Sequence, residues 1–161
     1  MVFTHRPVEA EDFEKIRLFP QSKREQFFMY PRWSYPVSAE EMREVARGRL
    51  LPTVLVDGEQ VAAYCNLYHA EGEEGLWLGN VIVSPAHRGR GAASTLLGCM
   101  MEQAKRELGA ERLSLMCHSV NTAALLLYHK LGFKPYDWSA KTGPDGEKLL
   151  LLKLTRSLQD L

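Results

Sequence analysis

The sequence from residue 80 to residue 97, NVIVSPAHRGRGAASTLL, decides most of the fold. An apolar run that ends at Pro85 predicts a strand, and apolar residues at helical spacing over 91–108 predict a helix. Between them lies a short basic turn, in which Gly89 and Gly91 let the backbone bend tightly and approach a ligand closely. The stretch therefore predicts a strand, a glycine turn and a helix in direct succession.

The glycine turn also predicts an anion site. The first amides of a helix have no intrahelical partner and lie at the positive end of the helix dipole, and Arg88 and Arg90 add charge suited to a phosphate diester. The turn matches neither common nucleotide motif, because Gly89, Gly91 and Ser94 do not give the dinucleotide spacing and no Gly-Lys-Ser/Thr of a P-loop is present. Taken alone, the window leaves an ordinary strand-to-helix turn as the alternative.

A second informative window covers residues 121–133, NTAALLLYHKLGF. At helical spacing, Asn121, Ala124 and Tyr128 share one face. An amide, a small residue and a phenol on that face could line a narrow crevice. The alternative is an N-cap asparagine and a tyrosine at the edge of the core.

Together the two windows resemble one family. Residues 88–93, RGRGAA, resemble the [Q/R]xxGx[G/A] acetyl-CoA signature of the GNAT superfamily of N-acetyltransferases, and residues 121–133 resemble its second signature, N-x-x-A-x-x-x-Y-x-x-x-G-F. Their order, with one helix and one strand between them, is also similar to that family. The resemblance implies a single domain over 1–161 that transfers an acetyl group from acetyl-CoA to an amine in a ternary complex.

The resemblance assigns roles to particular residues. The backbone from Arg88 to Ala93 would hold the CoA pyrophosphate, which involves Arg88, Gly89, Arg90, Gly91, Ala92 and Ala93. Val81 and Val83 would pair with the pantetheine arm through their backbones, with the Val81 amide facing the thioester carbonyl. Asn121 would hydrogen-bond the pantetheine. Tyr128 would lie beside the sulfur and protonate the departing thiolate.

The general base stays open. The strand that leads to the glycine turn reads LWLGNVIV and has no carboxylate. Asn80 lies where a base is expected, but it cannot take a proton, so we expect it to contact the acceptor instead. His118, Glu73, Glu74 and a chain of water molecules are the remaining alternatives.

The acceptor side is predicted from residues 21–37, QSKREQFFMYPRWSYPV, a segment rich in aromatic residues and proline. Rigid aromatic side chains can shape a slot and hold an ammonium group on a ring face. In the family this region commonly forms one wall of the acceptor pocket, so Trp33 and Tyr35 are expected to bind substrate, with Arg24 or Arg32 available for a carboxylate. The alternative is that these aromatics anchor the loop to the core. The expected acceptor is a primary amine on lysine or on a peptide.

Periodicity along the rest of the chain predicts one mixed α/β domain of about seven strands and four helices, in the order β-α-α-β-β-β-α-β-α-β-β. The resemblance implies a mostly antiparallel sheet. A bulge is expected at Gly79, and residues 20–37 are predicted to be irregular. The strands are expected over 2–8, 53–56, 60–68, 76–83, 113–117, 133–138 and 148–154, and the helices over 9–18, 38–47, 91–108 and 121–131.

Composition narrows the function classes. The 161 residues include 20 Lys+Arg and 20 Asp+Glu. This balance argues against a dedicated nucleic-acid binder and against a polybasic attraction to anionic membranes. The cysteines Cys65, Cys99 and Cys117 lie in apolar runs without metal-ligand spacing, so we expect buried thiols and no metal.

The first residues lack an apolar signal region, which favours a cytoplasmic protein. The family's frequent dimers leave a homodimer open. The alternative function is an acetyl-CoA sensor without catalysis, which would keep the glycine turn but would not need Tyr128.

Overall fold

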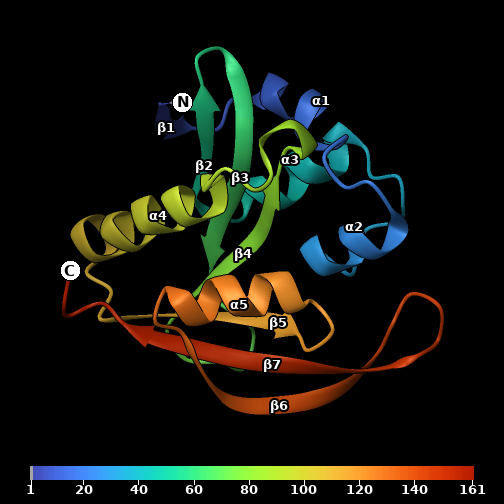
Figure 1. Ribbon diagram of the computed structural model, residues 1–161, viewed down its shortest axis with the longest axis vertical. Helices are drawn as coiled ribbons and strands as arrows, with labels where there is room; N and C mark the ends of the chain where they lie inside the picture. Colours follow the sequence, from blue (N-terminus) through green and yellow to red (C-terminus); the bar gives the residue numbers. More distant parts are fainter. Residues whose placement is uncertain (1) are drawn as a thin grey trace.

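A seven-stranded sheet forms the centre of the computed structural model, which describes residues 2–161 (Figure 1). Its strand order is β1-β2-β3-β4-β5-β7-β6. Every neighbouring pair is antiparallel except β4 and β5. The predicted mixed, mostly antiparallel sheet is therefore confirmed. The strands are β1 (Phe3–Pro7), β2 (Leu50–Asp57), β3 (Gln60–Tyr68), β4 (Leu76–Val83), β5 (Arg112–His118), β6 (Lys134–Thr142) and β7 (Lys148–Ser157).

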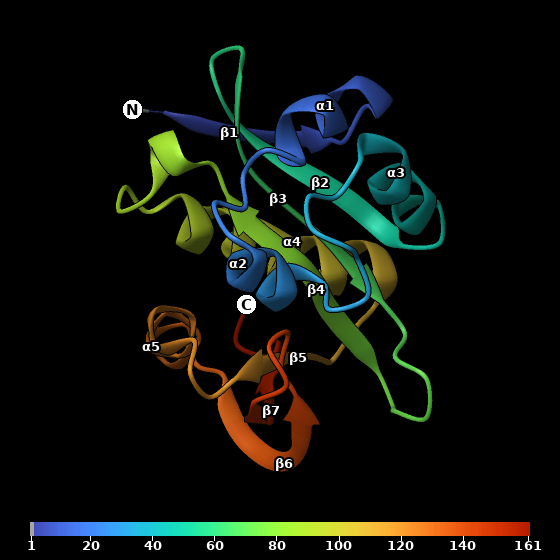
Figure 2. The same cartoon turned by 90° about the vertical axis from the view of Figure 1, so that its right-hand side faces the viewer.

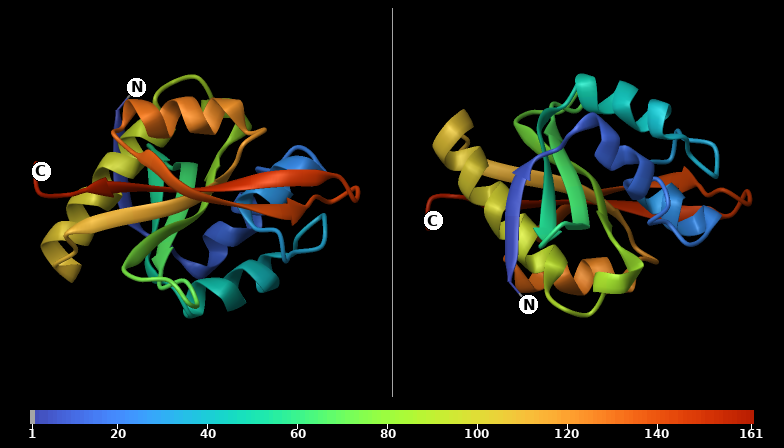
Figure 3. Two further views of the ribbon diagram at one scale, coloured as in Figure 1. Left: turned by 90° about the horizontal axis from the view of Figure 1, so that it is seen from below. Right: turned by 90° about the horizontal axis from the view of Figure 1, so that it is seen from above.

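Helices cover both faces of the sheet (Figure 3). The elements are η1 (Ala10–Asp12), α1 (Phe13–Ile16), α2 (Lys23–Met29), α3 (Ala39–Arg47), η2 (Pro85–His87), α4 (Ala92–Leu108) and α5 (Thr122–Lys130). On one face, Leu96 and Met100 of α4 pack with Phe133 and Leu115 in one buried cluster. On the other face, α1, α2 and α3 bury a separate cluster against β2 and β3. We call these the α4–α5 face and the α1–α3 face.

Within the described residues the helix count differs from the prediction, with five α-helices instead of four. The additional helix, α2, lies inside the segment predicted to be irregular. Ser22 is its N-cap, and the Ser22 hydroxyl accepts a hydrogen bond from the Glu25 amide at 3.1 Å. This serine three residues before a glutamate is a helix-start pattern, and it went unrecognised because Pro20 and Pro31 bracket the short helix closely.

Local sequence signals account for the start of α3 and for the turn between β2 and β3. Ser38 and Glu41 form a complete capping box at the start of α3. Asp57 pairs with Gln60 across a tight turn between β2 and β3, in which Gly58 takes a positive φ of 61°. The helix predicted over 9–18 is shorter, because a 3-10 turn is followed by only four residues of α-helix.

The sheet divides between β4 and β5. Their parallel pairing covers only Leu76–Leu78 against Leu113–Leu115. Beyond it the strands diverge, and Figure 2 shows β5, β7 and β6 set apart from the first four strands, with α2 beside the opening. The divergence leaves one edge of β4 without a strand partner.

A β-bulge on β4 lies at this division. Gly79 pairs with Asn66 and Ile82 pairs with Tyr64, so β4 carries one extra residue between these pairs. Asn80 has a positive φ of 55°, which asparagine tolerates better than most residues. The predicted bulge is present, one residue after the expected position.

The three cysteines differ in burial. Cys65 and Cys117 are buried and Cys99 is half-buried, so the expectation of buried thiols holds fully for two of the three. Within residues 2–161, no three His, Cys, Asp or Glu side chains are grouped to hold a metal ion. In the same part of the chain, no helix is long and apolar enough to cross a membrane.

Candidate active site

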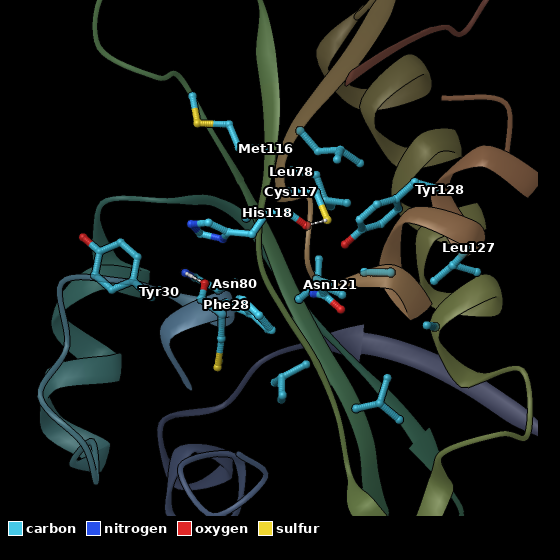
Figure 4. A pocket seen from close by; sticks show the side chains of 18 of the residues that line it. Phe28, Tyr30, Leu78, Asn80, Met116, Cys117, His118, Asn121, Leu127 and Tyr128 are labelled. Carbon is cyan, nitrogen blue, oxygen red and sulfur yellow. Dashed lines mark hydrogen bonds between the residues drawn. The ribbon is translucent and has the colours of Figure 1, made fainter. Parts of the chain in front are cut away.

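A cavity of about 1420 Å³ opens where β4 and β5 separate, and both faces of the sheet contribute to its walls (Figure 4). Its volume exceeds that of most single-ligand pockets and suits two substrates at once. The lining comes from the end of α2 and the residues after it, the start of β2, the end of β3, the bulge, the glycine turn with the start of α4, the end of β5 and one face of α5.

The glycine turn forms a concave set of backbone amides. Gly89 and Gly91 have φ values of 74° and 80°, in the left-handed region, and α4 begins directly after Gly91 without a side-chain cap. Within residues 2–161, none of the amides from Gly89 to Ser94 donates a hydrogen bond. Free amides at a helix N-terminus suit a phosphate, as the sequence predicted.

The two arginines of the turn differ in their surroundings. The Arg88 guanidinium pairs with Glu25 at 2.8 Å and donates to the carbonyls of Val83 and Phe19 at 3.2 and 3.1 Å. Its charge is thus compensated and its side chain ties the turn to α2, which leaves only its backbone for a ligand. Arg90 is exposed and forms no ion pair within the described residues. The expectation of a free positive charge at the turn therefore rests on Arg90.

The bulge leaves backbone groups free along the cavity. Val81 has no register partner on β3, and β5 has already diverged at this level. Val81 and Val83 both line the cavity. The predicted role of Val81, an amide that faces a carbonyl of the ligand, is compatible with this geometry.

The predicted face of α5 also lines the cavity, with Asn121, Ala124 and Tyr128. Asn121 holds the N-cap position, but its side chain makes no capping hydrogen bond and is half-exposed. Tyr128 is 7% exposed. Figure 4 shows its hydroxyl directed into the cavity, toward the side where Cys117 and Asn121 lie. Within residues 2–161 this hydroxyl makes no hydrogen bond, so it is available to a ligand.

Burial raises the pKa values of two ionisable groups at this end of the cavity, Tyr128 and Cys117. It raises the pKa of Tyr128 well above the ordinary phenol value, with the Cys117 and Cys65 thiols as smaller contributors. It also raises the pKa of the Cys117 thiol to about 12. Tyr128 therefore stays protonated at any working pH. A ligand thiol bound beside Cys117 would lose its hydration in the same way, which would raise its pKa too.

Asn80, expected to contact the acceptor, uses its side chain within the protein. Its Nδ2 donates to the Met29 carbonyl at 3.2 Å, and its Oδ1 accepts from Asn66 Nδ2 at 2.8 Å. Asn66 in turn contacts the Tyr64 hydroxyl at 2.9 Å and accepts from Arg49 at 3.1 Å. Asn80 thus joins the bulge to the end of α2, and it positions the backbone of the site.

We expect Asn80→Ala to lower the free energy of unfolding by about 3 kcal/mol, because two buried polar partners are left unpaired and alanine is strained at a positive φ. Asn80→Gly keeps the positive φ at no steric cost, so it should regain about 1 kcal/mol of this loss. Urea unfolding of both variants measures the difference. Two variants as stable as the parent chain would show that the network contributes nothing.

Among the candidate side-chain bases, only His118 lines the cavity. Its ring packs against Phe27 and Phe28 of α2, with centroids 4.9 and 5.5 Å away. Burial lowers the pKa of His118, which favours the neutral imidazole that can accept a proton. Glu73 pairs with Lys153 of β7 instead, and Glu74 is exposed, so neither lies at the cavity.

The end of α2 and the residues after it form a wall of the cavity, where the expected Arg32 is joined by aromatic residues other than Trp33 and Tyr35. Phe28, Tyr30 and Arg32 line it. Trp33 is half-buried, packs edge-on against Tyr30 with the ring centroids 4.4 Å apart, and is not part of the lining. Tyr35 is 44% exposed and also lies outside it.

Arg24, the other predicted carboxylate partner, also lies outside the lining. Its guanidinium stacks over Phe28, 5.4 Å from the ring centroid.

Sequence reasoning missed Arg49 and Tyr68, which also line the cavity. Arg49 follows the last turn of α3, and Tyr68 ends β3. Both positions look like ordinary element ends in the sequence. These side chains reach the bulge because β3 pairs with β4 so that Asn66 lies opposite Gly79.

Comparisons with known proteins agree with this geometry. The model of the acetyltransferase (GNAT) family matches residues 12–133. The uncharacterized N-acetyltransferase YobR of Bacillus subtilis (strain 168) is 37% identical over 81 residues, which cover 50% of this chain and 32% of that protein. The match thus spans about a third of that curated relative.

Two solved structures share the fold. A protein provisionally assigned as a phosphinothricin N-acetyltransferase superposes with a TM-score of 0.83 at 24% identity, over 98% of this chain and 99% of the other. Spermidine N-acetyltransferase from Vibrio cholerae, in complex with CoA and spermine, superposes with a TM-score of 0.79 at 18% identity, over 97% and 95% of the two chains. With the matched family model, the glycine turn and the face of α5, these findings lead to one assignment: the chain belongs to the acetyltransferase (GNAT) family.

Proposed function

We propose that the protein transfers an acetyl group from acetyl-CoA to a primary amine in a ternary complex. The observation that carries this proposal is the convergence of three features on one cavity: the free amides of the glycine turn, the unpaired backbone at Val81 and the buried hydroxyl of Tyr128. The membership of the GNAT family supports the same donor.

In this proposal, acetyl-CoA would extend from the glycine turn to Val81. The amides after Gly89 would hold the pyrophosphate, and exposed Arg90 would add a positive charge. Asn121 has a free amide side chain for the pantetheine arm. At the end of the path, the Val81 amide would donate to the thioester oxygen, where negative charge develops during attack.

His118 serves the acceptor in this proposal. An alkylamine has a pKa of about 10.4 and is mostly protonated at neutral pH, so it must lose a proton before its nitrogen can attack. As the new C–N bond forms, that nitrogen must give up a further proton. The neutral imidazole of His118 accepts it, directly or through water.

Tyr128 serves the leaving group. When the C–S bond breaks, the sulfur carries the electron pair, and the Tyr128 hydroxyl supplies a proton or a hydrogen bond to it. A phenol with a raised pKa is a poor acid toward an ordinary thiolate. Burial also raises the pKa of the neighbouring Cys117 thiol, so a thiolate buried beside Tyr128 would be a stronger base than in water and could still take its proton.

The acceptor is a primary amine of lysine or peptide type in this proposal. The structurally similar proteins are named for different amines, phosphinothricin and spermidine, so the shared fold supports an amine acceptor without choosing among amines. Aromatic Phe28 and Tyr30 line the wall that the amine would contact.

We expect kcat/KM to depend on pH in a way that reveals His118. Deprotonation of the amine alone gives log kcat/KM a slope of about 1 against pH, and a required neutral His118 adds a second unit of slope below its pKa, which lies under the ordinary value of about 6.5. His118→Gln should lower kcat/KM by about 100-fold and remove the steeper region. Exposed His129 on α5 is the control, since His129→Gln should leave the profile intact. An identical profile for His118→Gln would assign the proton transfer to water.

The alternative is a sensor that binds acetyl-CoA without catalysis. Calorimetry with acetyl-CoA and an assay for free CoA thiol with a panel of amines distinguish the two. Binding with amine-dependent thiol release supports the transferase. Binding without release from any amine would support the sensor.

A further inference from the structure

Arg49 is a cavity-lining arginine to which the proposed acetyl transfer assigns no role. It lies between α3 and β2 on the α1–α3 face, and it is half-buried. Its guanidinium stacks over Tyr68, 4.1 Å from the ring centroid, and lies 5.6 Å from the centroid of Tyr30. Its Nη1 donates to Asn66 Oδ1 at 3.1 Å. Two rings and one amide therefore hold the planar group in a fixed orientation.

The chain also makes room for this guanidinium. A Cβ atom at Gly79 would lie 2.4 Å from Arg49 Nη1 and 2.9 Å from the Tyr68 ring. Gly79 does not have a positive φ, so backbone conformation does not require glycine there. The stacked arginine instead occupies the space that a Cβ atom at Gly79 would take, which places the guanidinium against β4, next to the bulge.

The positive charge of Arg49 is not balanced by a carboxylate partner within the described part of the chain. Within residues 2–161 Arg49 forms no ion pair, whereas its neighbours Arg43 and Arg47 reach Glu14 and Glu44 at 3.2 and 2.8 Å. A guanidinium offers five N–H donors, and Asn66 uses the donors of only one nitrogen. A half-buried charge without a partner is unfavourable. An anion that enters the cavity and pairs with this guanidinium would therefore gain binding free energy.

The surrounding charges favour the same kind of ligand. Arg32 and Lys141 also line the cavity. Of the two carboxylates that line it, Glu25 is already paired with Arg88, and Glu71 is exposed. A polyamine would meet repulsion here, while an anionic group would meet attraction.

We propose that Arg49 binds a carboxylate of the acceptor, so that the acceptor is an amine that carries a carboxylate in the same small molecule, as amino acids do. The reach is suitable, because Gly79 and Val81 are two residues apart, which is at most about 7 Å of extended chain. One small molecule can therefore place its carboxylate on Arg49 and its amine near the carbonyl held at Val81. The inference rests on the proposed acetyl transfer and narrows its acceptor.

The test compares matched acceptors. Glycine, β-alanine and lysine are each offered as the free carboxylate and as the carboxamide, at equal concentrations of neutral amine, and released CoA thiol is measured. We expect kcat/KM to be at least about tenfold higher for the carboxylates, the scale of one charge-assisted pair. Arg49→Met should remove this preference, mainly through a higher KM for the carboxylates. Arg49→Lys should retain part of it, because lysine keeps the charge but lacks the planar fork.

Arg47→Met is the matched control. It removes the same charge two residues away, on an exposed side chain outside the cavity lining, and should keep the preference of the parent chain. If the parent chain turns over both forms equally, or if Arg49→Met keeps the preference, the role of Arg49 is refuted while acetyl transfer stands. If Arg49→Met does not fold, Arg49→Lys and the parent chain still decide. Acetyl-CoA binding without thiol release from any amine refutes the proposed function, and this inference with it.

Discussion

Replacement of Tyr128 by phenylalanine should lower kcat by about 100-fold, the usual scale for loss of a positioned general acid. The ring would keep its edge-on packing with Phe133, whose centroid is 6.1 Å away, so the fold of α5 should persist. The hydroxyl makes no hydrogen bond within the described residues, so its removal leaves no protein group unpaired. We therefore expect the dissociation constant of acetyl-CoA to stay within about twofold, since the hydroxyl acts on the departing sulfur rather than on the bound donor.

The control is Tyr136→Phe, which removes the hydroxyl of a tyrosine that is 54% exposed on β6. It should leave both kcat and donor affinity unchanged. Stopped-flow thiol release and calorimetry give the two quantities separately. An unchanged kcat for Tyr128→Phe would remove Tyr128 from the acid role.

Replacement of Gly91 by valine should weaken acetyl-CoA binding by about 10- to 100-fold. A left-handed conformation costs an L-residue about 1–2 kcal/mol, so in the free variant the turn would relax, and binding would have to restore the strained conformation. About 1.4 kcal/mol corresponds to a tenfold change in affinity. A β-branched side chain is especially unfavourable at the observed φ of 80°. The new side chain would also stand where the backbone must approach the pyrophosphate.

Gly109 provides a control with the same backbone strain. It ends α4, has a φ of 63°, and has open space around an added Cβ, as Gly91 has. Gly109→Val should lower stability by a similar amount and leave acetyl-CoA affinity unchanged. Equal affinity losses in both variants would mean that the effect comes from strain in α4, and the anion site at the turn would be disproved.

The sequence predicted the local geometry of the proposed donor half because that half lies within short windows. The glycine turn, the start of α4 and the face of α5 each lie within one short window, where positive φ values and helical spacing leave a readable pattern. Asn121, Ala124 and Tyr128 needed only the helical repeat to be placed together. Their position on the cavity agrees with that expectation.

The acceptor half was less predictable because it depends on contacts between distant segments. Trp33 and Tyr35 were reasonable choices by composition, but the direction of α2 gives the lining to Phe28, Tyr30 and Arg32. Arg49 lies at the bulge through contacts with distant residues, Asn66, which is 17 positions away, and Tyr68. Helix α2 itself was overlooked, although Ser22 and Glu25 carry a start signal.

The bulge shows a similar limit. Glycine in a strand indicates an irregularity, and Gly79 was read in that way. The extra residue lies between Gly79 and Ile82, and the space beside Gly79 is occupied by Arg49 and Tyr68. The sequence around Gly79 cannot reveal this, because the side chains that fill the space come from other elements.

The central claim is that this cavity joins an acetyl group to an amine. The most direct measurement incubates the folded protein with acetyl-CoA and the panel of amines, and follows both free CoA thiol and acetylated amine by mass spectrometry. We predict equal amounts of the two products, formed only when protein, donor and amine are all present, and about 100-fold more slowly with Tyr128→Phe. Acetyl-CoA bound by the protein, with no acetylated amine from any acceptor, would contradict the claim.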